Sequence, residues 1–231
     1  MQDRIEFTRE MKRDYTILIP NMLPVHLRLV RDVFKLHGYN MVLLDNEGPG
    51  VVEAGLKYVH NDTCYPALLC IGQFIDALQS GRYDLNRTAL IITQTGGGCR
   101  ASNYISLIRK ALKKAGMDYI PVISLSFTGL EKHPGFDLSL GQWLRMVFAV
   151  LYGDLLMNLV NQCRPYELRE GSAEELSAEW IERLGMELGN SRLPSYRAVK
   201  ANYRAMAASF ASLPMERCEK VKVGIVGEIF V

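Results

Sequence analysis

The chain has 231 residues, of which 48% are apolar and 23% charged, and its formal net charge is +2. This composition is typical of a globular protein with one large or two small domains. The low net charge gives no reason to expect nucleic acid or an anionic membrane surface as a partner. The segment Met1 to Asp14 has mixed charges and no apolar core, so it is not a secretory signal.

Two further features bear on location. The stretch from Leu138 to Val160 is strongly apolar, but it contains Gln142, Arg145 and Asp154, which the interior of a bilayer would disfavour. We therefore expect a long core helix and no membrane span. The cysteines number five and are irregularly spaced, which does not fit a secreted disulfide framework. Both features indicate a cytoplasmic protein whose thiols are free or bind metal.

The first half alternates short apolar runs with amphipathic segments. Strands are expected at residues 15–20, 40–45, 88–95 and 120–126, with a brief additional strand at 58–60. Helices are expected at 22–37, 51–57, 66–81 and 102–116, the third capped by Asp62 or Thr63. This alternation predicts an α/β fold with a parallel, doubly wound sheet of the Rossmann or flavodoxin type.

The second half has a different pattern. Three helices are expected at 139–162, 173–188 and 195–211, and a new strand pattern begins at Lys220. We therefore predict an α/β domain over residues 1–137 and a helical segment over 138–219 that packs on it. Residues 220–231 are interpreted as the first strand of a following α/β domain, which makes this chain a fragment of a longer protein.

Two cysteines occupy positions where ligands bind in α/β proteins. Cys64 lies in Tyr58-Val-His-Asn-Asp-Thr-Cys-Tyr-Pro66, and Cys99 lies in Gln94-Thr-Gly-Gly-Gly-Cys-Arg-Ala-Ser-Asn-Tyr104. Each is expected where a strand gives way to a helix, at the carboxyl edge of the sheet. Thiolates are stabilised at helix N-termini. We therefore predict that Cys64 and Cys99 face one crevice and bind a shared metal or cluster.

The spacing leaves the kind of centre open. Zinc could use Cys64, Cys99 and His60, but the close C-x2-C pairs of zinc sites and of thioredoxin-type redox pairs are missing. An iron–sulfur cluster can take thiolates from distant loops, and Gly96, Gly97 and Gly98 would allow backbone N–H groups to approach it.

A metal-free alternative uses the same loop. Gly96 to Ala101 matches the G-x-G-x-x-A dinucleotide pattern, and a nucleotide or CoA phosphate could bind there with Arg100 and Ser102. The pattern follows an inner strand, however, and the next strand ends without an acidic ribose ligand. An ATPase P-loop motif does not occur in the sequence.

The remaining candidates have simpler interpretations. Cys70, Cys163 and Cys218 are interpreted as small buried residues, and His133 as a histidine of a surface loop. Asn103 and Tyr104 fit the first turn of a helix.

Several strings resemble one family. They are Lys57-Tyr-Val-His-Asn-Asp-Thr-Cys-Tyr-Pro-Ala67, Gln94 to Tyr104, Tyr152-Gly-Asp154, Arg164-Pro-Tyr-Glu167 and Val223-Gly-Ile-Val-Gly-Glu228. The family is the large bacterial and archaeal protein family related to 2-hydroxyacyl-CoA dehydratases and their activators. The resemblance spans about Phe7 to Val231 and corresponds to the dehydratase-like region, not to the activase region.

This resemblance implies a [4Fe–4S] cluster held by three cysteines from two adjoining α/β domains. Cys64 and Cys99 would be two of the ligands, and the third would lie beyond Val231. In dehydratase relatives an ATP-hydrolysing activase supplies one low-potential electron, and a ketyl radical then allows elimination of water. The partner implied here is such an activase module, in the same chain or separate, with an acyl-CoA or another small molecule as substrate.

The leading hypothesis is therefore an iron–sulfur domain of a dehydratase-like enzyme or ATP-coupled reductase that is not active as this fragment alone. Arg100, Ser102 and Asn103 are candidates for contacts to the cluster or substrate, and a homodimer is possible. The alternatives are the metal-free phosphate-binding domain and a passive scaffold.

Overall fold

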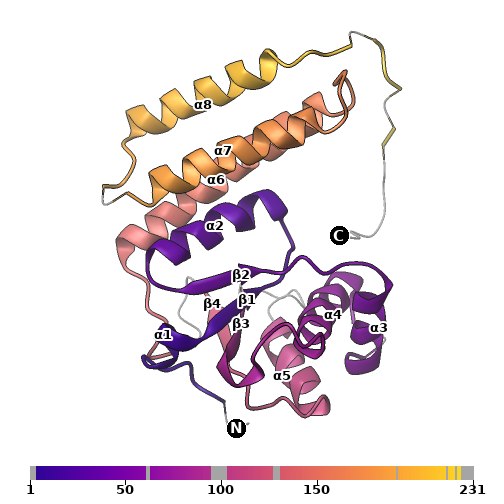
Figure 1. Ribbon diagram of the computed structural model, residues 1–231, viewed down its shortest axis with the longest axis vertical. Coiled ribbons are helices and arrows are strands. Elements are labelled where there is room, and N and C mark those ends of the chain that lie inside the picture. Colours follow the sequence, from indigo (N-terminus) through magenta and orange to yellow (C-terminus); the bar gives the residue numbers. More distant parts are fainter. Residues whose placement is uncertain are drawn as a thin grey trace. The chain divides into compact units, whose positions relative to one another are not determined.

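The computed structural model describes residues 4–60, 63–94, 103–126, 131–190, 192–216, 218–221 and 223–224 (Figure 1). The elements of the first part of the chain are α1 (Met11–Asp14), β1 (Thr16–Ile19), α2 (Pro24–Leu36), β2 (Asn40–Leu43), α3 (Pro49–Tyr58), α4 (Tyr65–Gln79), the 3-10 turn η1 (Leu85–Arg87), β3 (Thr88–Thr93), α5 (Tyr104–Lys114) and β4 (Val122–Leu125). Three helices follow: α6 (Leu140–Cys163), α7 (Ser172–Leu188) and α8 (Tyr196–Ala211).

These elements form two compact units. The first, the sheet unit, contains the four strands with α1, α3, α4 and α5, and the second, the helical unit, contains α2, α6, α7 and α8. The chain passes from the sheet unit to the helical unit between Asp137 and Leu138, and α2 also groups with the helical unit.

The sheet unit is built on four parallel strands in the order β2-β1-β3-β4. Ile17 of β1 is paired with Met41 of β2 on one side and with Ala89 of β3 on the other. The strands are short and mostly buried, as expected of parallel strands covered by helices. The predicted α/β class with a parallel sheet is confirmed, and the strand order, which reverses direction after β2, is that of a doubly wound sheet.

Two glycines allow α3 and α4 to pack unusually closely. A Cβ atom added to Gly72 of α4 would lie 2.1 Å from the carbonyl oxygen of Val51, and one added to Gly55 of α3 would lie 2.6 Å from Leu68. No side chain larger than hydrogen fits at either position without moving a helix. This contact fixes α4, whose buried face contributes Ile71, Phe74 and Ile75 to the core of the sheet unit.

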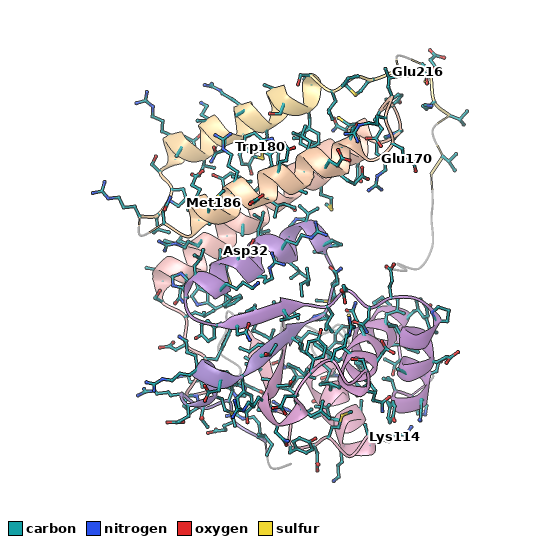
Figure 2. The ribbon with its side chains drawn as sticks, in the orientation of Figure 1. Asp32, Lys114, Glu170, Trp180, Met186 and Glu216 are labelled. Atoms are coloured by element: carbon teal, nitrogen blue, oxygen red, sulfur yellow. The ribbon has the colours of Figure 1, made fainter. Side chains whose placement is uncertain are left out.

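The helical unit places α6 and α7 between α2 and α8 (Figure 1). The buried residues of α6 recur every three or four positions, which defines one face of the helix. Ser139 and Gln142 form a capping box at its start. Asn202 of α8 donates hydrogen bonds to Tyr152 Oη at 3.0 Å and to Glu187 Oε2 at 2.6 Å, and it thereby joins three helices. Figure 2 shows the side chains of this unit, with Asp32 on α2 and Trp180 and Met186 on α7.

The segment Arg164 to Glu167 directly follows α6 and begins the connection to α7. Arg164 forms an ion pair with Glu174 of α7. Glu167 accepts hydrogen bonds from the backbone N–H groups of Gly171 and Ala173, at 2.7 and 2.8 Å. These hydrogen bonds lower the pKa of Glu167 and satisfy donors at the start of α7.

By length and composition α6 resembles a membrane-spanning helix, and 39% of its most apolar window is buried within the protein. The core helix of a soluble protein meets the same criteria. Its buried face carries Arg145, which donates hydrogen bonds to the carbonyl oxygens of Leu188 and Asn190 at 2.8 Å each.

Four local expectations are wrong. Tyr58 ends α3, so residues 58–60 form no strand, and the N-cap of α4 is Cys64 instead of Asp62 or Thr63. Cys218 is exposed, whereas it was interpreted as a buried residue. His133 is buried because the N-terminal segment covers it: the N–H of Phe7 donates to His133 Nδ1 at 3.0 Å. The strand expected at 220–231 lies largely outside the described residues.

Candidate functional site

Cys64 occupies the N-cap of α4 and its side chain is exposed. It follows the end of α3, so it connects two helices and does not directly follow a strand as the sequence predicted. Gly55 and Gly72 allow α3 and α4, the helices on either side of this connection, to pack closely. The thiol therefore lies at the start of a helix that packs closely on α3, and it is accessible to a ligand.

The thiol of Cys64 meets the start of α5. Its Sγ lies 3.8 Å from Oη of Tyr104, the first residue of α5. The ring of Tyr104 is buried against the core of the sheet unit, with 8% of the residue exposed. Because α5 follows the carboxyl end of β3, Cys64 lies at that edge of the sheet.

The second cysteine loop connects β3 to α5. Gly96, Gly97, Gly98, Cys99, Arg100 and Ser102 all lie outside the described residues. The predictions made for them, including the phosphate site at Gly96 to Ala101, therefore stay predictions. Asn103 is described: it is the N-cap of α5 and it is exposed. Tyr104, beside Cys64, is five positions after Cys99 in the sequence.

A polar network holds the loops that follow β1 and β2 against α4. Gln73 Oε1 accepts from the N–H of Asn21 at 2.7 Å, and Gln73 Nε2 donates to the carbonyl oxygen of Asn46 at 2.9 Å. The side-chain amide of Asn46 donates to the carbonyl oxygen of Gln73 and, at 2.7 Å, to Asp76 Oδ2. One side chain of α4 thus ties two strand ends to the helix that presents Cys64.

A second contact fixes the end of β3. Ser124 Oγ of β4 donates to Gln94 Oε1 at 2.6 Å, and the N–H of Gln94 donates to the carbonyl oxygen of Leu125 at 2.9 Å. Gln94 is the residue at which the Cys99 loop begins. Of the two described residues that flank this loop, Gln94 is therefore held by β4, and Asn103 is the N-cap of α5.

The other thiols of the described chain differ from Cys64 in their surroundings. Cys70 is buried on α4, and burial raises its pKa to about 12, with a smaller contribution from the neighbouring Cys64. Cys163 is buried at the end of α6, and burial raises its pKa as well. The prediction that Cys70 and Cys163 are buried structural residues is confirmed. Neither is suited to bind a metal as a thiolate.

Within residues 4–60, 63–94 and the later described ranges, no group of three or more His, Cys, Asp or Glu side chains is arranged to bind a metal ion. His60, the third ligand of the zinc alternative, is exposed in the link before Cys64. Cys99 is outside the ranges searched, so this finding does not bear on a site that includes Cys99.

Comparison with known proteins gives no further assignment: no family model, curated protein or solved structure matches the chain.

Sequence reasoning missed the residues that support the site. Gln73 interrupts the apolar run 66–75 of α4, and a single polar residue in such a run is the signal that could have identified it. Tyr104 was assigned only a first-turn role, and its approach to Cys64 depends on how α4 and α5 pack.

Proposed function

We propose that the sheet unit is an iron–sulfur domain in which Cys64 and Cys99 ligate one [4Fe–4S] cluster at the carboxyl edge of the sheet. The observation that carries this proposal is the contact between Cys64 and Tyr104. It brings an exposed thiol on α4 to the helix that directly follows the Cys99 loop. The helix that follows the Cys99 motif in sequence therefore begins beside Cys64.

The surroundings of Cys64 suit a cluster ligand. The thiol is exposed at the start of a helix and can be reached by iron, in contrast to Cys70 on the same helix. The Tyr104 hydroxyl can donate a hydrogen bond to a ligating sulfur, which is one way in which proteins adjust cluster potential. When bound, the cluster would supply one-electron chemistry, and this chain would supply its attachment and its hydrogen-bonding environment.

The wider role follows from the motif resemblance. We infer a dehydratase-like enzyme or an ATP-coupled low-potential reductase that receives electrons from an activase module and acts on an acyl-CoA or another small molecule. The exposed Asn103 at the start of α5 is then a candidate for contact with the cluster or substrate. The third cysteine ligand is expected beyond Val231.

Anaerobic reconstitution with iron, sulfide and a small-molecule thiol, which can take the place of the third cysteine ligand, tests the proposal. We expect a broad charge-transfer absorption in the visible region that is lost in Cys64→Ala and in Cys99→Ala. The matched controls are Cys163→Ala, which removes a buried thiol, and Cys218→Ala, which removes an exposed one. Both controls should retain the absorption and the bound iron.

The proposal is wrong if the wild-type chain takes up no iron above the level of the double variant Cys64→Ala/Cys99→Ala. It is also wrong if the absorption survives in either single variant and is lost in Cys218→Ala. The second result would assign the iron to the exposed thiol near the end of the described chain.

A further inference from the structure

Helix α8 and the segments beside it carry charge of a single sign. Residues 188–215 contain no Asp or Glu, but they contain four cations, which are Arg192, Arg197, Lys200 and Arg204. All four are exposed, and among the residues that the structure describes none of them has an ion-pair partner. A helix face that meets only solvent typically mixes both signs of charge. This part of the helical unit therefore has positive charge that the described chain does not compensate.

The exposed face of α8 has two halves. Arg197, Lys200 and Arg204 are three and four positions apart, so they share one side of the helix over a rise of about 10 Å. After Arg197, the other exposed residues of the helix are all alanines, namely Ala201, Ala207, Ala208 and Ala211. Because alanine side chains are short, a partner can approach the second half of this face closely.

A largely apolar groove of about 580 Å³ lies beside this second half. Its lining includes Ala207 and Ala211, which belong to the exposed face of α8, together with Leu159 of α6 and Tyr166. The segment that follows α8 forms one wall, where the N–H of Glu216 donates to the carbonyl oxygen of Tyr166 at 2.6 Å. The groove is large enough to accept apolar side chains of a partner.

We propose that this face of α8 and the groove beside it bind an acidic amphipathic helix of a partner protein. Acidic side chains of the partner pair with Arg197, Lys200 and Arg204, and apolar side chains one and two turns further along enter the groove beside Ala207 and Ala211. From residue 197 to residue 211 the face rises about 21 Å, which matches about four turns of a partner helix.

Other anionic partners fit this surface less well. A basic helix binds a membrane surface by inserting its apolar face, but in α8 that face is already buried through Met206 and Phe210. A nucleic acid would pair its phosphates with the cations and would leave the apolar groove empty. An acidic helix with apolar side chains uses both halves of the face.

Fluorescence anisotropy with designed helical peptides tests this inference on the whole chain. The probe has three Glu at the spacing of Arg197, Lys200 and Arg204, and two Leu one and two turns further along the same face; a second version has the reverse order. In one control peptide Gln replaces each Glu, and in the other Ser replaces each Leu. We expect one version of the probe to bind saturably and its controls to bind at least about tenfold more weakly, because three ion pairs or two apolar contacts are lost. No saturable binding of either version, or equal binding of a control, overturns the proposal.

Charge variants assign the binding to α8. The double variant Lys200→Gln/Arg204→Gln should weaken binding of the probe by about three- to tenfold and leave the Gln control peptide unaffected. The matched control is Lys110→Gln/Lys113→Gln, which removes two exposed cations from α5 and should change neither. Equal effects of the two double variants would place the binding elsewhere and overturn the assignment.

A second pair of variants tests the groove. Ala207→Gln places a longer side chain at an exposed position in the groove lining, so it should weaken binding of the probe and leave the Ser control peptide unaffected. Ala178→Gln at an exposed position of α7 is the matched control and should have no effect. The fluorescence of Trp143 and Trp180 checks that the helical unit stays folded. Equal effects of Ala207→Gln and Ala178→Gln would exclude the groove as the site of the apolar side chains and overturn the proposal.

The remaining occupants of this face can be distinguished in the same way. If phosphatidylglycerol vesicles or a DNA oligonucleotide bind more tightly than the probe and lose that binding in Lys200→Gln/Arg204→Gln, the proposal is wrong. A second copy of the chain could supply Glu179 and Glu182, which are exposed on α7. A dimer at low salt that the same double variant dissociates would make that copy the occupant and would also overturn the proposal.

Discussion

Gly72 provides the sharpest test of how the fold positions Cys64. It lies on α4 where this helix crosses α3, and an added Cβ would lie 2.1 Å from the carbonyl oxygen of Val51 and 2.9 Å from the backbone nitrogen of Gly55. Both neighbouring atoms belong to the backbone of α3, so neither can rotate away as a flexible side chain would. Gly72→Ala therefore forces the two helices apart.

The expected cost follows from that geometry. Ordinary contact begins at 3.4 Å, so α3 and α4 must separate by about 1 Å, and overpacking of this kind costs about 3 kcal/mol at the upper end of its usual range. Alanine is better than glycine in a helix by about 1 kcal/mol. We therefore expect the free energy of unfolding of the sheet unit to fall by about 2 kcal/mol.

The control is Gly50→Ala on α3, where the nearest atom to an added Cβ is Asp76 Oδ1 at 3.4 Å and belongs to a side chain. This substitution should be neutral or slightly stabilising. Urea titration followed by alkylation of the buried Cys70, read by mass spectrometry, reports the sheet unit. Tryptophan fluorescence reports the helical unit. If Gly72→Ala exposes Cys70 at the same urea concentration as the wild type, the close crossing of α3 and α4 is refuted.

Three further predictions use the titratable groups. In the native apo chain at mildly alkaline pH, iodoacetamide should modify Cys64 and Cys218 but not Cys70, whose pKa burial raises to about 12; fast modification of Cys70 would contradict its burial. Burial lowers the pKa of His133, so this side chain binds a proton more readily in the unfolded chain than in the folded one. The free energy of unfolding of the sheet unit should therefore fall as the pH drops below about 6.5. In His133→Asn the amide oxygen can still accept the hydrogen bond from the N–H of Phe7, but the side chain no longer titrates, so the fall in stability with pH should disappear. If urea titrations of this variant show the same fall, another group is responsible. Backbone hydrogen bonds lower the pKa of Glu167, so the stability that they give to the helical unit is lost as the pH falls below about 4.3. Tryptophan fluorescence measures this loss, and a Glu167→Gln variant whose stability falls with pH in the same way would refute the role of Glu167.

Much of the fold could be predicted from local sequence. The apolar runs that became β1, β2, β3 and β4 are short and bounded by turn residues, which distinguishes buried strands from helices. The helices were also placed to within a few residues, because the glycines and capping residues that bound them act locally. These signals require no knowledge of which elements pack together.

Features that depend on packing could not be predicted in this way. His133 lies between Gly129 and Gly135 and was expected in a surface loop, yet a segment more than a hundred residues earlier in the chain covers it. The run from Tyr58 to His60 has the composition of a strand, but α3 continues through Tyr58. A long-range contact determines the burial of His133, and the position at which α3 ends determines the conformation of residues 58–60.

The candidate site shows the same division. The exposure of Cys64 at a helix start agrees with the prediction from its turn-rich surroundings. The contact with Tyr104 and the bridge made by Gln73 join elements that are distant in sequence, and no local pattern predicts such pairs.

The central claim is that Cys64 and Cys99 ligate one cluster, and protection of both thiols in a single sample tests it most directly. The chain is reconstituted anaerobically to increasing iron content, alkylated, and analysed by mass spectrometry, with the exposed Cys218 as the internal control. The account predicts that Cys64 and Cys99 lose reactivity together and in proportion to bound iron, while Cys218 stays reactive. Unchanged reactivity of Cys64 in the iron-loaded chain would contradict it.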